Sequence, residues 1–166
     1  TRLLEAFPAP DLAAGVVVLR GGASMSVAMP PYLPFLQALG DYVLAAGPEL
    51  LREQVGFHHA ALATLLPELR ARLGPAPPLH PLGPEQERYR LYEAVAGFLA
   101  AIAARSPLVL LLDDLHYVDA ASCDLLIHLA GRLRSAPLLV VGAFREAEAG
   151  DNSAFDWTLA ELNRRR

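Results

Sequence analysis

The most apolar stretch of the chain is LVLLL, Leu108 to Leu112, and two carboxylates, Asp113 and Asp114, follow it directly. A strand with one exposed face alternates apolar and polar residues, whereas this run is apolar at every position. It therefore predicts a strand buried on both faces, as in a parallel sheet covered by helices. Such a strand delivers its last residues to the carboxyl edge of the sheet, where α/β folds bind ligands.

Two other runs predict strands. Val16 to Arg20 is β-branched and flanked by glycines, and Pro137 to Arg145 contains LLVV. Segments with helical spacing separate the three strands, and this alternation predicts a parallel sheet with right-handed crossovers. Because three strands make a thin open sheet, we expect at least one more strand before Thr1.

Helical periodicity is present in seven segments: 1–7, 32–46, 49–55, 60–73, 85–105, 120–133 and 154–166. Pro34 fits a helix only in its first turn, and Pro67 is a candidate break in the fourth segment. The fifth segment is the longest, with an apolar stripe formed by Tyr89, Tyr92, Val95, Ala96, Leu99 and Ile102. Gly74 to Pro84, with five prolines, predicts a surface loop.

Composition narrows the class of protein. A chain of 166 residues suits one domain, and 54% hydrophobic against 19% charged residues fits a packed α/β core. A net charge of −4 gives no global basic field for nucleic acid. No apolar run approaches the ~20 residues of a membrane span. The first residue is Thr1, so we expect a fragment, in which absent targeting signals mean little.

The titratable side chains exclude some chemistry. All 14 Lys or Arg residues are arginines. Residues 1–166 therefore contain neither a lysine for a Schiff base nor a phosphate-loop lysine. A single cysteine, Cys123, allows no internal disulfide and suits a reducing compartment. The pair Asp113 and Asp114 beside a dry core is costly unless a cation or hydrogen-bond donors meet it. Mg²⁺, which takes oxygen ligands, is the natural candidate.

Three stretches carry a resemblance to a known family. Leu108 to Ser122 (LVLLLDDLHYVDAAS) and Leu138 to Glu146 (LLVVGAFRE) resemble the Walker B and sensor 1 segments of STAND-class P-loop ATPases. Pro30 to Leu39 (PPYLPFLQAL) resembles the region after the second strand there. The chain is most similar to the ATPase module of large ATP-binding LuxR-type transcriptional regulators, which is also attached to some bacterial adenylate cyclases and protein kinases. The resemblance implies a P-loop NTPase fold, a truncated three-layer α/β/α sandwich with a mostly parallel sheet, spanning residues 1–166.

The resemblance also implies site residues. The family's phosphate loop ends in GKTRLL and this chain begins TRLL, so Thr1 would be the hydroxyl residue of that loop. Thr1 and Asp113 would hold Mg²⁺. Asp114 would polarise the attacking water, although glutamate is commoner in that role among related ATPases. Arg145 would sense the γ-phosphate of ATP through its planar guanidinium.

The function implied is an ATP-binding, slowly hydrolysing regulatory switch in a larger cytoplasmic signalling protein, with ATP and Mg²⁺ bound. Its DNA-binding or cyclase output domain would lie outside this chain, and the chain itself would contact neither nucleic acid nor membrane. Self-association is left open. The alternative is a degenerate ATPase fold that serves as a scaffold or interaction module, which the absence of lysine motivates.

Simpler structural interpretations stand beside these. Asp113 and Asp114 could be turn and cap residues, and Arg145 could pair structurally with Glu146 or Asp114. Thr1 could be an ordinary terminal residue.

Other candidate residues have alternative interpretations too. The pattern D-D-x-H-x-x-D, Asp113 to Asp119, also matches hydrolytic metal ligands, but no second histidine cluster supports it. His58 and His59 are expected to be a surface and a core histidine rather than metal ligands. Cys123 is expected to be a small buried hydrophobe rather than a nucleophile.

Overall fold

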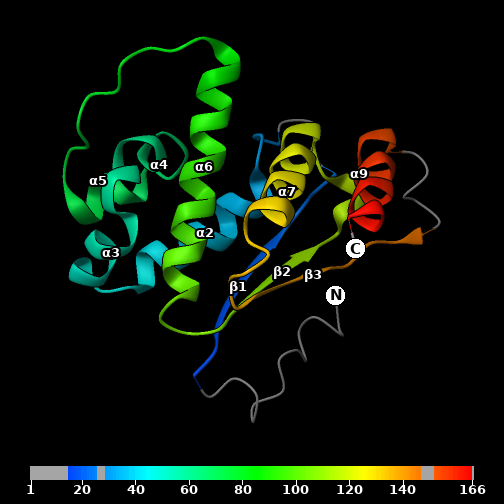
Figure 1. Cartoon of the computed structure of the whole chain (residues 1–166), viewed down its shortest axis with the longest axis horizontal. Helices are drawn as coiled ribbons and strands as arrows, with labels where there is room; N and C mark the ends of the chain where they lie inside the picture. The colour runs from blue at the N-terminus through cyan, green and yellow to red at the C-terminus, as the bar shows by residue number, and fades with distance from the viewer. Residues whose placement is uncertain (1–14, 26–28, 147–151, 166) are drawn as a thin grey trace.

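A three-stranded parallel sheet forms the centre of the fold (Figure 1). The computed structural model describes residues 15–25, 29–146 and 152–165. The strands are β1 (Val17–Gly22), β2 (Leu108–Asp113) and β3 (Leu138–Gly142), in the spatial order β1-β2-β3. Val17 pairs with Leu108, and Leu108 pairs with Leu138. The three predicted strands and their parallel arrangement are therefore confirmed.

The predicted bounds of two strands are wrong. Gly21 and Gly22 were expected to close β1, but they belong to it, because they pair with the last two residues of β2. The predicted strand Pro137 to Arg145 is too long, since pairing with β2 extends only from Leu138 to Gly142. In both cases the partner strand sets the boundary, which no local pattern reports.

The helices follow the predicted segments closely. They are α2 (Leu33–Ala45), α3 (Pro48–Val55), α4 (His59–Leu65), α5 (Glu68–Leu73), α6 (Pro84–Ala103), α7 (Ala120–Arg132) and α9 (Ser153–Arg164), with short 3₁₀ turns η1 (Gly56–His58) and η2 (Leu115–Tyr117). Pro34 lies in the first turn of α2. The predicted helix 60–73 is interrupted at Pro67, between α4 and α5. The helix expected at residues 1–7 lies outside the described residues.

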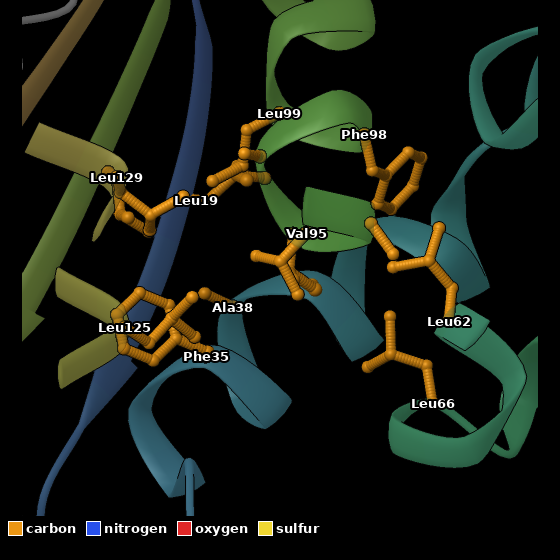
Figure 2. Packing of buried hydrophobic residues seen from close by; sticks show 14 of the residues in the cluster. Leu19, Phe35, Ala38, Leu62, Leu66, Val95, Phe98, Leu99, Leu125 and Leu129 are labelled. Atoms are coloured by element: carbon orange, nitrogen blue, oxygen red, sulfur yellow. The ribbon is translucent and has the colours of Figure 1, made fainter. Parts of the chain in front are cut away.

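The described helices pack against one face of the sheet. Figure 2 shows Leu19 of β1 among side chains from α2, α4, α6 and α7. The other face carries a smaller cluster of Val109 and Leu111 of β2, with half-buried residues from β1 and β3 or their ends. All five apolar residues of β2 are buried, so its burial on both faces is confirmed. A second helical layer remains a prediction.

The predicted apolar stripe on α6 is wrong at its first member. Tyr89 is 60% exposed, and the buried residues of the helix begin at Tyr92. Helical spacing identifies a face but not where the core ends along it, and the first two turns of α6 lie beyond the core. No described helix is long and apolar enough to cross a membrane.

The predicted loop at Gly74 to Pro84 is confirmed up to Gly83, because residues 74–83 form neither helix nor strand. The predicted burial of Cys123 is also confirmed: it is 3% exposed on α7. That burial raises the pKa of the thiol, as expected of an unreactive side chain.

Candidate functional site

The two carboxylates lie at the carboxyl edge of the sheet. Asp113 is the last residue of β2, and Asp114 follows it; both are half-exposed. The Oδ1 atom of Asp113 accepts a hydrogen bond of 2.9 Å from the main-chain N–H of Asp114. The carbonyl of Asp113 accepts one of 3.0 Å from the N–H of Ala23, directly after β1. The ends of both strands therefore hold Asp113 at the edge.

Asp114 has a left-handed backbone conformation, with φ 52° and ψ 38°. Within the described residues, Tyr32 is the other non-glycine residue with positive φ. Aspartate and asparagine tolerate this region better than longer side chains, because their short polar groups bond locally. The backbone therefore gives a physical reason for aspartate, rather than glutamate, at this position. Its carbonyl accepts a hydrogen bond from the N–H of Tyr117, which forms η2.

The turn η2 is hydrogen-bonded to residues at the end of β3 and at the start of α9. The N–H of Leu115 donates to the carbonyl of Ala143, just after β3, at 2.9 Å. The side-chain amide of Asn152 donates to the carbonyls of His116 and Val118 at 3.1 and 2.9 Å. Asn152 also caps α9, since its Oδ1 accepts from the N–H of Phe155. Sequence reasoning missed Asn152, and a helix-capping asparagine was the available signal.

Asp119 links two helices rather than joining the acidic pair. It is the N-cap of α7, where Oδ1 accepts from the N–H of Ser122 at 3.0 Å and Oδ2 from the Ser122 hydroxyl at 2.5 Å. Oδ2 also accepts from the N–H of Tyr32, before α2, at 3.3 Å. The described part of the chain contains no group of three or more His, Cys, Asp or Glu placed to hold a metal ion. The pattern from Asp113 to Asp119 therefore does not gather into a ligand set there.

Replacing Asp119 by Ala is expected to lower the free energy of unfolding by about 1–2 kcal/mol, because it removes the cap of α7. It also removes the acceptor for Tyr32. Urea unfolding would measure the loss, with Asp124→Ala as the control, because Asp124 is an exposed aspartate on the same helix. Equal stabilities of the two variants would contradict the capping role.

Arg145 reaches the same edge from β3. Since β2 and β3 are parallel neighbours, the residues that follow them emerge on the same side. The main-chain N–H of Arg145 donates to Nδ1 of the buried His116 at 3.4 Å, and the Arg145 residue is exposed. The structure therefore brings Asp113, Asp114 and Arg145 to one edge, while Thr1 lies outside the described residues.

A pocket of about 610 Å³ opens beside this edge. Its lining comes from η2, the first turns of α7 and α9, and a residue after β1: Met25, His116, Tyr117, Ala120, Asn152, Ser153 and Ala154. The predicted histidine pair lies elsewhere, and both His58 and His59 are half-buried. The pocket therefore lies beside the acidic pair rather than around it, since none of Asp113, Asp114 and Arg145 lines it.

A parallel α/β sheet whose central strand ends in accessible carboxylates belongs to the class of folds that bind ligands at the carboxyl edge. The family model described as an AAA ATPase domain matches residues 1–141, so the chain belongs to that family. This membership implies nucleotide binding and NTPase activity, and AAA ATPases generally bind ATP with Mg²⁺. Neither a search of curated proteins nor one of solved structures found a match.

Proposed function

We propose that this domain binds MgATP at the carboxyl edge of its sheet and hydrolyses it slowly, as a regulatory switch. The observation that carries the proposal is Asp113, held half-exposed at the end of a fully buried central strand, with Asp114 beside it. The resemblance to STAND ATPases further favours a larger cytoplasmic signalling protein of the LuxR regulator type, with an attached DNA-binding or cyclase output.

The donor chemistry of the edge fits a magnesium ion. Asp113 offers carboxylate oxygens, which are the ligands Mg²⁺ takes, and the family mechanism pairs such a residue with a phosphate-loop hydroxyl, here Thr1. When bound, Mg²⁺ neutralises charge on the β- and γ-phosphates. Hydrogen bonds at Oδ1 and at the main-chain carbonyl restrain Asp113 in place.

The hydrolytic step gives the other two residues their roles. Asp114 orients a water and accepts its proton as the water oxygen bonds to the γ-phosphorus and the bond to the ADP oxygen breaks. The Arg145 guanidinium then stabilises charge on the γ-phosphoryl oxygens. Asp114 and Arg145 follow neighbouring parallel strands, which supports their action on one substrate.

A switch also needs an element that responds to the nucleotide. The turn η2 directly follows Asp114 and is bonded through Asn152 to the start of α9. A movement of Asp114 would therefore reach α9 through hydrogen bonds already present. This connection supports a regulatory role and marks α9 as the element to monitor.

Calorimetric titration of MgATP into the full-length native protein tests the proposal. Asp113→Asn is expected to weaken MgATP binding by at least ~10-fold, because it removes a charged metal ligand. The amide oxygen of Asn can still accept from the N–H of Asp114, so the fold should persist. Titration of ATP with EDTA is the control, in which the two proteins should bind alike.

Two outcomes would contradict the proposal. If Asp113→Asn weakened ATP binding equally with and without Mg²⁺, Asp113 would not be a metal ligand. No heat from a folded wild-type sample would favour the scaffold alternative.

A further inference from the structure

A long groove lies along α6, away from the carboxylates. It has a volume of about 900 Å³ and is formed by α6, η1, the start of α4, the loop 74–83 and the end of α7. Leu79 and Leu82 form its wall on the loop side, and Phe57 lines it from η1. None of the proposed ATP-site residues that the structure describes lines it. Its volume is in the range of small-molecule sites, ~300–1,000 Å³.

The groove depends on a specific fit between a glycine and a histidine. A Cβ atom at Gly97 would lie 2.4 Å from Nε2 of His58, so the bare backbone of α6 makes room for the imidazole. Burial lowers the pKa of His58, and the nearby Glu93 carboxylate opposes that shift. The ring also packs against Phe57, with centroids 3.9 Å apart. The imidazole therefore adds a largely neutral aromatic surface to the lining.

The loop wall of the groove is held by side chains of α6. Arg90 Nη1 donates to the carbonyl of His80 at 3.0 Å, and Glu87 Oε1 accepts from the N–H of Leu82 at 3.0 Å. These bonds hold the wall without a ligand, which reduces the ordering cost of binding.

The charges that face the groove favour a cation. Both guanidiniums in the lining are engaged: Arg90 pairs with Glu87, and Arg132 Nε lies 3.3 Å from both carboxylate oxygens of Glu93. The carboxylate of Glu85 also lines the groove, and within the described residues it makes no ion pair.

Two exposed aromatic rings complete the lining. Phe57 is 91% exposed and Tyr89 is 60% exposed. The face of such a ring attracts a cation. The groove therefore combines apolar walls, two exposed aromatic side chains and a carboxylate that pairs with no described cation.

We propose that this groove binds a small aromatic molecule that carries a protonated amine. The apolar part packs against Phe57, Tyr89 and the leucines of the loop, and the ammonium group lies toward Glu85. This function goes beyond ATP binding, because the site is separate and prefers the opposite charge to a nucleotide.

Nuclear magnetic resonance titration of the full chain tests the proposal with three matched probes. These are 2-(2-naphthyl)ethylammonium, the neutral 2-(2-naphthyl)ethanol and the anion 2-naphthylacetate, which share one ring system. The amide signal of Gly97 and the imidazole of His58 report binding in the groove. We expect the cation to bind most tightly, the alcohol next and the anion least, with shifts centred on these two residues.

Substitutions separate the contributions. Glu85→Gln should weaken binding of the cation by about two- to fivefold, the size of one exposed charge contact, and leave the affinity for the alcohol unchanged. Phe57→Ala and Tyr89→Ala should each weaken binding of the cation by about two- to fivefold. Trp157→Ala is the control, since Trp157 is a similarly exposed aromatic, 56%, on α9.

Three results would overturn the proposal. They are binding of 2-naphthylacetate as tight as that of the cation, shifts centred away from Gly97, and no saturable shift with the cation at millimolar concentration. Because no nucleotide is present in this titration, its failure leaves the ATP proposal standing.

Discussion

Replacing Asp114 by Asn is expected to lower ATP turnover by about 10²- to 10⁴-fold, the usual contribution of a general base. The affinity for MgATP should change little, because Asp113 remains. Asparagine suits this test since it tolerates the left-handed backbone found at Asp114, φ 52°. The substitution therefore removes the charge and leaves the turn η2 in place.

Release of phosphate by the full-length native protein measures the effect, with calorimetry of MgATP as the check on binding. Asp114→Glu makes a useful comparison, because it retains a carboxylate but places a longer side chain on a left-handed backbone. It should have intermediate turnover and lower thermal stability. Wild-type turnover by Asp114→Asn would show that another group activates the water.

Replacing Gly21 by Ala is expected to destabilise the domain by about 3 kcal/mol or more, the upper range for an overpacked core. A Cβ atom at Gly21 would lie 1.8 Å from the carbonyl oxygen of Pro34, in the first turn of α2. This neighbour is backbone, so either the strand or the helix must move. The close approach of β1 to α2 therefore depends on the missing side chain.

The neighbouring Gly22 provides a matched control. A Cβ atom there would meet only Asp113, at 3.6 Å from its carbonyl oxygen and 3.7 Å from its Cβ, which are ordinary contacts. Gly22→Ala should stay within about 1 kcal/mol of the wild type. Urea unfolding of both variants measures the difference, and similar losses in the two would refute the steric explanation.

Local sequence signals predicted most of the framework. Five consecutive apolar residues were enough to place β2, because few structures other than a doubly buried strand accommodate such a short run. Pro34 and Pro67 correctly marked the first turn of α2 and the break before α5, since proline restricts the backbone directly. The acidic pair was found because it follows β2 without an intervening residue.

Features that depend on distant contacts were not predicted. Tyr89 follows the helical spacing of its neighbours, but only the packing shows that its side chain lies outside the core. The bond from Tyr32 to Asp119 joins positions far apart in the chain. Asn152 likewise acts on η2 from the start of α9. The left-handed backbone of Asp114 carries no local signal beyond its tolerance by aspartate.

The pairing of β1 with β2 has a consequence for how the protein is made. Val17 pairs with Leu108, so about ninety residues must be synthesised before β1 can pair with β2. At a synthesis rate of about 5–20 residues per second, the edge of β1 that faces β2 stays unpaired for roughly 5–20 seconds. Contacts this remote in sequence also slow refolding, because a long loop must close first. The helices α2 to α6 lie within that interval, so they can form while the sheet is still incomplete.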